Sequence, residues 1–303
     1  MIRLTIRQMQ YFERLAETLH FGRAAMSCGV TQPALSAQIS EMESQLGFRL
    51  FERGSGGVRL TAEAQAMLPR VARILSEVRD LEGEARRERK ALEGRFRLGV
   101  IPTIAPYLLP ELLPLLKQRF PQLRLEVREA VTAALAEDTA SGRLDAMIAA
   151  EPVEDSRLAP DLLFEDPFYL AVPTADAARI APPVAQESMA LERLMLLEDG
   201  HCMRGQALEI CGRVKPVTME TFGATSLTTL LHMVSHGMGV TLIPRMARAS
   251  ANLLPSVSVL PFLDPSPSRS ICLAGRKSNP RKDDFAALHE TVLQAHEALL
   301  ARG

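Results

Sequence analysis

The chain has 303 residues, of which 47% are hydrophobic and 23% charged, with a formal net charge of −1. This composition is typical of a folded soluble protein of two or three compact units, and the balanced charge gives no global sign of a nucleic-acid partner. The amino terminus lacks the apolar segment of a signal peptide and no run reaches the roughly 18 apolar residues of a membrane span, so we expect a cytoplasmic protein without membrane contact.

The first 60 residues have the pattern of a helix-turn-helix. The buried face of a first helix is predicted by apolar residues at helical spacing, namely Tyr11, Phe12, Leu15 and Leu19. Gly29 permits a tight turn, and Thr31 can then cap a second helix with Pro33 in its first turn. The buried stripe of that helix is formed by Leu35, Ile39, Met42 and Leu46. In such a motif the second helix enters the major groove of DNA.

A polar face of the second helix and the segment after it are predicted to contact DNA. Gln32 and Ser36 lie on this face, which suits phosphates and base edges. Residues 49–60 are predicted to form a glycine-tipped hairpin whose Arg49, Arg53 and Arg59 make a wing for the DNA backbone. A small helical bundle without a DNA role is the alternative.

The same region resembles the LysR-type transcriptional regulators. The resemblance rests on Phe21-Gly22-Arg23-Ala24-Ala25, on Val30-Thr31-Gln32-Pro33-Ala34-Leu35-Ser36, and on residues 46–53 and 60–64. It implies a winged helix-turn-helix over residues 1–60, with DNA contacts expected from Arg23, Thr31, Gln32, Pro33, Ser36 and Arg53. It also implies a homodimer that assembles as a dimer of dimers on promoter DNA and contacts RNA polymerase.

Residues 61–93 are predicted to form one long linker helix, interrupted only by Pro69 and Gly83. An apolar seam with a spacing near 3.5 residues runs through Ala64, Met67, Val71, Ile74 or Leu75, Val78 and Leu81. Because such a helix has no domain of its own to pack against, we expect it to pair with a second copy of the chain. A single solvated spacer is the alternative.

Residues 94–303 change to an alternation of strands and helices. Strands are predicted at 96–101, 123–127, 144–149, 168–172, 194–197, 240–244 and 270–274, and helices at 108–120 and 135–141. This alternation predicts an α/β unit with a parallel sheet and helical crossovers. The LysR resemblance implies a two-lobed regulatory domain like that of periplasmic binding proteins. Lobe one would comprise residues 94–165 and 269–303, and lobe two residues 166–268, joined by two crossover strands around an effector cleft.

Two of the four cysteines lie in one short stretch, and no CxxC pair suggests a zinc ribbon or a thioredoxin-type centre. Cys202 is preceded by His201 and followed closely by Arg204, and nearby positive charge favours the reactive thiolate. If residues 203–211 are helical, Cys202 and Cys211 lie about 13 Å apart along the axis, whereas a disulfide needs Cα atoms about 5.5 Å apart. A bond between them would require this segment to unwind. The alternative is that both are inert buried thiols.

Polar side chains from separate segments are predicted to converge on one cleft. Ligands of open α/β sheets bind at the carboxyl ends of strands, where Thr103, Thr132 and His201 are expected; Arg269 precedes another strand. Together with residues 99–103, 106–110, 196–202, 224–227 and 237–244, this pattern resembles the peroxide-sensing members of the LysR family. That resemblance implies Cys202 as the peroxidatic cysteine and Cys211 as its resolving partner. It also implies that Thr103, Thr132, His201 and Arg269 surround the peroxide.

The expected function is a peroxide-responsive transcriptional regulator of antioxidant genes, not an enzyme. Peroxide would oxidise one thiolate to a sulfenic acid that condenses with a second thiol, and a thiol reductant of the glutaredoxin or thioredoxin type would reset the switch. No cofactor or metal is expected, and Cys28, Cys272, His232 and His236 are expected to be structural or surface residues. The alternatives are a LysR regulator with a small-metabolite effector and inert cysteines, a thiol peroxidase, and a solute-binding protein.

Overall fold

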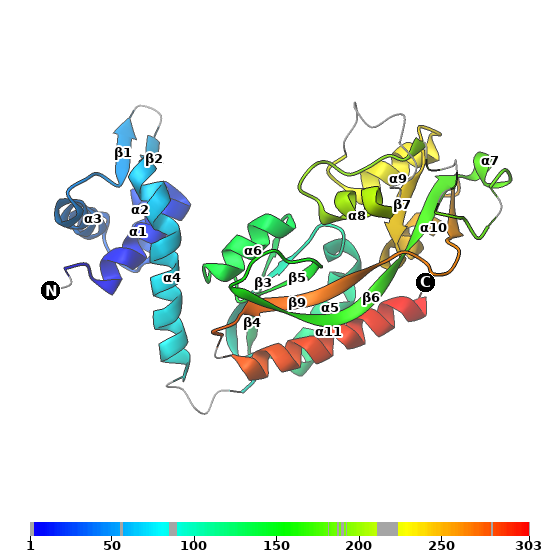
Figure 1. The fold of residues 1–303 in the computed structure, drawn as a ribbon. Coiled ribbons are helices and arrows are strands. Elements are labelled where there is room, and N and C mark those ends of the chain that lie inside the picture. Colours follow the sequence, from blue (N-terminus) through cyan, green and yellow to red (C-terminus); the bar gives the residue numbers. More distant parts are fainter. Residues whose placement is uncertain are drawn as a thin grey trace. The chain divides into compact units, whose positions relative to one another are not determined.

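The structure, a computed structural model, describes residues 3–54, 57–84, 90–180, 182–186, 188, 191, 193–210, 224–279 and 281–302. The chain divides into two compact units (Figure 1). The first unit is built from residues 1–88 and the second from residues 89–140 and 144–303. Within the described ranges, none of the helices has both the length and the apolar character that crossing a membrane requires.

Three helices and a hairpin make up most of the first unit. These are α1 (Ile6–Thr18), α2 (Phe21–Ser27), α3 (Gln32–Leu46), and the antiparallel strands β1 (Phe51–Gly54) and β2 (Gly57–Leu60). Helix α1 begins with a capping box, in which the Thr5 hydroxyl accepts the Gln8 N–H and the Gln8 side chain accepts the Thr5 N–H. Between α2 and α3 the chain turns at Gly29, whose φ of +66° is left-handed and favours glycine.

The core of the first unit follows the predicted apolar stripes with one exception. The buried side chains include Phe12, Leu15, Leu35, Ile39 and Met42. Leu19, however, is 43% exposed, because it is the left-handed residue that ends α1 and so leaves the helical stripe.

Helix α4 (Ala62–Glu84) differs from the predicted linker helix in two respects. The first half of α4 packs against α1, and its Val71 and Leu75 are buried in the core of the first unit. The expectation that this helix has no domain to pack against was therefore wrong for its first half. The helix was also predicted to continue to residue 93. Instead residues 91 and 92 form a turn, because Leu92 is buried in the second unit and its N–H donates to Asp284 Oδ1 at 2.6 Å.

The second unit begins with a parallel arrangement of strands. Strand β3 (Gly94–Val100) pairs in parallel with β4 (Leu123–Glu129) and with β5 (Ala146–Ala150). The connections are the helices α5 (Ala105–Arg119) and α6 (Thr132–Ala140). This part matches the predicted alternation, because each crossover returns the chain in the same direction.

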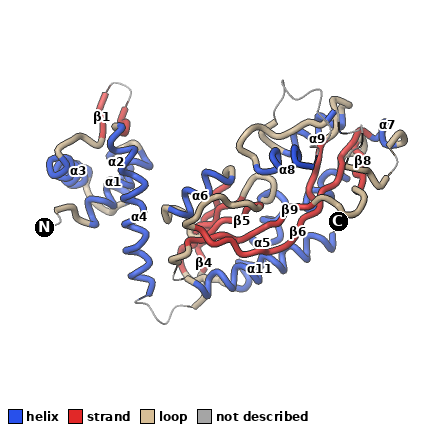
Figure 2. Tube along the Cα trace, viewed as in Figure 1, coloured by secondary structure: helices blue, strands red, loops and turns tan. Residues whose placement is uncertain are grey.

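Two long strands connect this sheet to the rest of the second unit (Figure 2). Strand β6 (Leu158–Pro173) pairs with β9 (Ser268–Arg276) along its first part, and with β7 (Thr241–Pro244) and β8 (Val257–Pro261) along its second part. All these pairings are antiparallel, as is that of β5 with β9. The predicted parallel arrangement therefore holds for β3, β4 and β5, whereas β9 enters the sheet from the opposite direction.

The remaining elements are short helices and one long one. They are α7 (Thr174–Ala177), α8 (Cys202–Ile210), α9 (Leu227–Ser235), the 3₁₀ helix η2 (Arg245–Ala247), α10 (Arg248–Asn252) and α11 (Lys282–Arg302). Helix α11 runs beside α5 and β6 (Figure 1). The strand predicted at 194–197 is reduced to single bridges, Leu194 with Val240 and Leu197 with Ala224. After α9, Gly239 has a steric role, because a Cβ on it would lie 2.6 Å from the Arg193 carbonyl oxygen.

Candidate redox site and nucleic-acid interface

The first turn of α3 presents the polar face that the sequence predicted. Thr31, Gln32 and Pro33 are exposed and Ser36 is half-buried, while Leu35 is turned into the core. Thr31 occupies the N-cap position, but its side chain makes no capping hydrogen bond, so that part of the expectation was wrong. An exposed helix start with a hydroxyl that is not used for capping is suited to a phosphate group.

The other residues predicted to contact DNA lie on α2 and on the hairpin. Arg23 is exposed, and its Nη2 donates to the Thr18 carbonyl at 2.9 Å, which fixes where the guanidinium lies. Arg53 belongs to β1 and pairs with Val58, but its side chain is outside the described set. Glu43 was not predicted to matter, yet its Oε1 accepts the N–H groups of Leu50 and Phe51 at 2.7 and 3.2 Å, which joins the hairpin to α3.

Cys202 is the first residue of α8 and is half-buried against the core of the second unit. The loop before it turns at Gly200, which has a φ of +93°. Arg204, expected to supply positive charge to the thiol, is engaged elsewhere: its Nε lies 2.8 Å from Asp199 Oδ1 and its Nη1 donates to the Leu197 carbonyl at 3.0 Å. Arg204 therefore fixes the loop in front of α8. Cys211 lies outside the described residues, and so does its expected pairing.

Arg269 and Thr103 are brought together by the fold. Both are 2% exposed, and Arg269 Nη1 donates to Thr103 Oγ1 at 2.8 Å while its Nη2 donates to the Thr103 carbonyl at 3.2 Å. Because the guanidinium occupies an acceptor position of this hydroxyl, the hydroxyl proton remains available to donate to a third group.

Asp166 forms a buried ion pair with Arg269 and was not predicted from the sequence. Its Oδ2 accepts from Nε and Nη2 of Arg269 at 3.1 and 3.0 Å, and its Oδ1 accepts the Met246 N–H at 3.3 Å. Burial raises the pKa of Asp166, while the adjacent guanidinium and the backbone N–H of Met246 oppose that rise. Asp166 and Arg269 face each other in the β6–β9 ladder, so only a known register reveals the pair.

The loop that carries His201, and the helix α8 that follows it, lie close to the elements that hold Thr132 and Arg269. A Cβ on Gly200 would lie 3.9 Å from Val131 Cγ1, which places the loop beside the start of α6 and Thr132. Farther along α8, Gln206 Nε2 donates to the Glu151 carbonyl at 3.2 Å, and the Glu151 N–H donates to the Ser270 carbonyl, next to Arg269. His201 is half-buried, and its backbone carbonyl accepts the Arg204 N–H.

Two buried oxygens near the loop make no hydrogen bond to the described part of the chain. They are Thr132 Oγ1 and Gln206 Oε1. A buried polar atom without a partner costs free energy unless water or a ligand satisfies it. The site therefore has unused hydrogen-bonding capacity for a small polar molecule near Cys202.

The other cysteines fit structural roles. Burial, together with the negative charges of Glu151 and Asp161 and of an ionised Cys202, raises the pKa of the Cys272 thiol to about 12. Cys28 is half-buried against the core of the first unit. Among the residues that the structure describes, no three metal-ligating side chains form a group, and this includes the region of His232 and His236.

Comparison with known families assigns both units. Residues 6–65 match the family described as "Bacterial regulatory helix-turn-helix protein, lysR family", and residues 89–297 match "LysR substrate binding domain". The matched ranges correspond to the helix-turn-helix of the first unit and to almost all of the α/β second unit.

Individual relatives cover nearly the whole chain. The chain is 38% identical to a "Hydrogen peroxide-inducible genes activator" of Dickeya chrysanthemi over 293 residues, 95% of each protein. It is 37% identical to the "DNA-binding transcriptional dual regulator OxyR" of Escherichia coli over 289 residues, again 95% of each.

A solved structure of full-length Pseudomonas aeruginosa OxyR, in a form with one cysteine replaced by aspartate, matches with a TM-score of 0.82, 33% identity, and coverage of 96% of this chain and 98% of that one. A cysteine-to-serine mutant of Corynebacterium glutamicum OxyR, with hydrogen peroxide bound, matches with a TM-score of 0.67, 29% identity, and coverage of 99% and 95%. The chain therefore belongs to the LysR family of transcriptional regulators, which are not enzymes, and is a homologue of OxyR.

Proposed function

We propose that this protein is a peroxide-responsive, DNA-binding activator of antioxidant genes, switched by a reversible disulfide between Cys202 and Cys211. The observation that carries the proposal is the position of Cys202 at the start of α8, beside a region with a buried Thr103–Arg269 pair and two oxygens without partners in the described chain. Relatives described as hydrogen peroxide-inducible activators align over 95% of the chain.

The chemistry requires peroxide as the oxidant. The Cys202 thiolate attacks one peroxide oxygen, the O–O bond breaks, and the departing hydroxide takes a proton and leaves as water, so that a sulfenic acid remains. The Cys211 thiolate then attacks that sulfur and displaces a second hydroxide, which also leaves as water. Peroxide is reduced by two electrons and two thiols become one disulfide. A dithiol reductant of the glutaredoxin or thioredoxin type restores both thiols by exchange.

Thr103, Thr132, His201 and Arg269 are the proposed peroxide-binding residues. The Thr103 hydroxyl, held by Arg269, has its proton available for a peroxide oxygen, and the unused Thr132 oxygen can accept a peroxide proton. The buried guanidinium would stabilise the negative charge that develops on the departing oxygen, with little reorganisation during the reaction.

Disulfide formation would reshape the regulatory unit. Residues Cys202–Ile210 are helical, so the ends of α8 lie about 12 Å apart along the axis, far beyond disulfide reach. Helix α8 must therefore unwind when Cys202 and Cys211 join. We propose that this change alters how regulatory domains (residues 94–303) pair in a dimer of dimers in the cytoplasm, and thereby how domains 1–60 and linkers 61–93 engage promoter DNA and RNA polymerase.

DNA contact is assigned to Arg23, Thr31, Gln32, Pro33, Ser36 and Arg53. Exposure of the first turn of α3 supports base-edge and phosphate contacts there, and the arginines add phosphate contacts whose strength falls with salt.

Thiol mapping tests this function. The fully reduced protein would receive one equivalent of peroxide without oxygen, and alkylation with mass spectrometry would locate every thiol and disulfide. We expect a Cys202–Cys211 linkage that a dithiol reverses, and none in Cys202→Ser, while Cys28→Ser should react like the unaltered protein. Free thiols at both positions, together with intact DNA binding, would instead favour a LysR regulator with a small-metabolite effector.

A further inference from the structure

The second unit begins at a backbone position that is unfavourable for its residue. Leu92 has a φ of +53°, in the left-handed region that favours glycine, and its side chain is buried in the core of this unit. A residue other than glycine keeps such a conformation only where the surrounding structure holds it, and positions of this kind gather where a protein switches or binds. The contacts around Leu92 show what holds it.

Two charged residues at the beginning of α11 fix this position, and we call them the entry clasp: Arg281 and Asp284. The Leu92 N–H donates to Asp284 Oδ1 at 2.6 Å, and Arg281 Nε donates to Asp284 Oδ2. Asp284 is 5% exposed and lies in the first turn of α11, where the helix N-terminus favours a negative charge. Arg281 Nη1 also donates to the Arg95 carbonyl at 3.2 Å, and its Cζ lies 4.9 Å from the centre of the Phe96 ring.

The start of β3 is held a second time through Asp145. The Arg97 N–H donates to Asp145 Oδ2 at 2.7 Å, and the Arg97 guanidinium donates to both carboxylate oxygens at 3.1 and 3.2 Å. Arg281 Nη1 lies 3.7 Å from Asp145 Oδ1, so the entry clasp and this pair belong to one network. The chain is therefore fixed at several points over residues 92–97.

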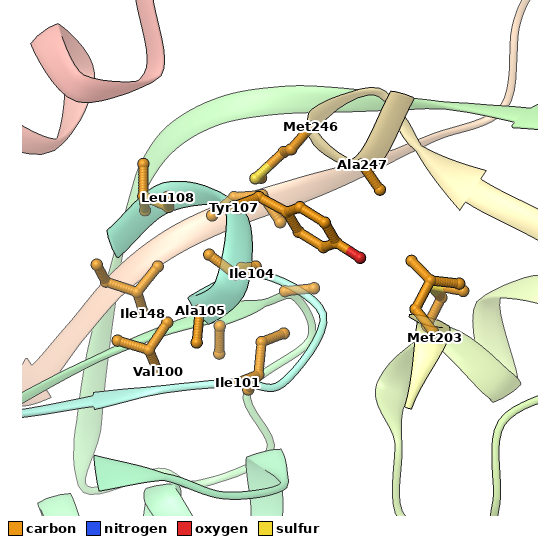
Figure 3. Packing of buried hydrophobic residues seen from close by; sticks show 14 of the residues in the cluster. Val100, Ile101, Ile104, Ala105, Tyr107, Leu108, Ile148, Met203, Met246 and Ala247 are labelled. Atoms are coloured by element: carbon orange, nitrogen blue, oxygen red, sulfur yellow. The ribbon is translucent and has the colours of Figure 1, made fainter. Parts of the chain in front are cut away.

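Strand β3 connects the entry clasp with the candidate site. It ends at Val100, three residues before Thr103, whose hydroxyl accepts from Arg269. Figure 3 shows Val100 and its β5 partner Ile148 in the buried cluster to which Leu92 also belongs. Because β3 is paired on both sides, by β4 and by β5, and close-packed interiors transmit strain, a displacement at Thr103 reaches Leu92.

We propose that Asp284 is a positioning residue that couples the candidate site to the chain entry, so that a rearrangement at the site moves the backbone at Leu92 and, through it, the α4 helix that precedes it in the sequence. Without the entry clasp, backbone rotation at Leu92 would absorb the same movement, because the left-handed conformation is the less stable one for leucine. The inference rests on the proposed function, and it names the point at which the peroxide signal leaves the regulatory domain.

Hydrogen exchange of the reduced protein tests the entry clasp without peroxide. In Asp284→Ala the Leu92 amide loses its acceptor and should exchange at least about tenfold faster, as loss of a hydrogen bond to a charged group implies. The Gly94 amide, which donates to the Gln122 carbonyl at 3.0 Å, should change by less than about twofold. Asp283→Ala, at the exposed neighbour in the same turn of α11, is the matched control. Equal exchange of the Leu92 amide in the two variants would overturn the entry clasp.

DNA binding before and after peroxide treatment tests the coupling. Quantitative footprinting of the full-length protein, on a DNA duplex selected from a random pool by the reduced form, gives a dissociation constant in each state. In Asp284→Ala the ratio of the two constants should move at least about threefold closer to one, whereas Asp283→Ala should keep the unaltered ratio. Thiol mapping should show the same Cys202–Cys211 linkage in every variant. Faster exchange at Leu92 together with an unaltered ratio would overturn the coupling, since a merely structural role for Asp284 lowers stability without changing this ratio.

Asp284→Asn is the milder variant that separates coupling from a general loss of folding. Asparagine keeps an oxygen for the Leu92 N–H but has no charge for Arg281, so both the exchange rate and the DNA ratio should lie between the values of the unaltered protein and of Asp284→Ala. Values outside that interval would contradict the proposal. If the unaltered protein forms no disulfide with peroxide, the proposed function fails and the coupling with it. If the disulfide forms and Asp284→Ala responds fully at the DNA, only the coupling is refuted.

Discussion

At the scale of single residues, one buried ion pair determines the geometry of the candidate site. Arg269 and Asp166 have fully buried side chains, and the guanidinium also reaches both the hydroxyl and the carbonyl oxygen of Thr103. The Phe168 ring lies 5.9 Å from the same guanidinium. A buried pair of this kind contributes little net stability compared with apolar residues of the same size, but removal of one partner leaves an uncompensated charge.

Asp166→Asn should therefore be costly. We expect the free energy of unfolding to fall by about 3 kcal/mol, because the amide keeps an acceptor but no charge for Arg269. Oxidation of Cys202 by peroxide should also slow, because Arg269 loses the group that fixes its position. Denaturant unfolding and stopped-flow oxidation measure the two effects.

Glu165→Gln is the matched control for that change. Glu165 is the exposed neighbour whose carboxylate accepts from Ser268 and Ser270, and its substitution should change the free energy of unfolding by under about 0.5 kcal/mol. If Asp166→Asn were as mild as Glu165→Gln, the ion pair would not be holding Arg269 in place.

The thiols of Cys202 and Cys272 should differ sharply in reactivity. With a pKa of about 12, only about one Cys272 thiol in ten thousand is ionised at pH 8, and its side chain is fully buried. We expect iodoacetamide to modify Cys202 at least about a hundredfold faster than Cys272 in the folded, reduced protein. Peptide mapping over time measures both rates. Comparable rates, with the protein still folded, would show that Cys272 is accessible and that its structural role is mistaken.

At the scale of elements, α11 is fixed to β6 partly through a buried histidine. His296 stacks on Phe164 with ring centroids 3.6 Å apart, and it is 8% exposed. Burial, together with a smaller effect from the positive charge of Arg245, lowers the pKa of His296 from 6.5 to about 4. The histidine is therefore neutral in the folded protein over a range in which the unfolded chain already binds a proton.

The stability that His296 contributes should be fully present above pH 6.5 and should be lost as the pH falls toward 4. Between pH 7 and pH 4.5 the expected loss is roughly 2.5 kcal/mol in the free energy of unfolding. Comparing His296→Gln with the unaltered protein by denaturant unfolding at both pH values isolates this contribution. The pH dependence should shrink by that amount in His296→Gln and should persist in His289→Gln, whose ring is more exposed.

The sequence predicted local features better than long-range ones. The helices α1 to α3 follow from apolar spacing and from the turn at Gly29, because these signals act within a few residues. Strand direction was predicted less well, since the antiparallel entry of β9 depends on pairing with β6 more than 100 residues away. The pairing of Asp166 with Arg269 could not be predicted for the same reason, because the two residues are far apart in the sequence. The ion pair of Arg204 with Asp199 could not be predicted either, because it depends on the loop geometry at Gly200.

At the scale of the whole molecule, α4 has two faces with different roles. Val71 and Leu75 are buried against the helices of the first unit, whereas Ile74 and Leu81 are 41% and 68% exposed. The two exposed residues are seven apart, so they lie on one face of the helix. An exposed apolar pair of this kind fits the proposed homodimer, in which a second α4 would cover it.

Substitutions on the two faces of α4 should therefore have separable effects. Ile74→Arg combined with Leu81→Arg should weaken the dimer at least about tenfold while leaving the helix content unchanged, because the side chains are exposed within one chain. Leu75→Arg should instead unfold the first unit, because it places a charge in the core. Glu77→Arg, an exposed charge reversal on the same helix, is the control and should affect neither property strongly. Sedimentation at several concentrations measures the dimer, and circular dichroism measures the helices. A double variant that remains as tightly associated as Glu77→Arg would exclude this face of α4 from the interface.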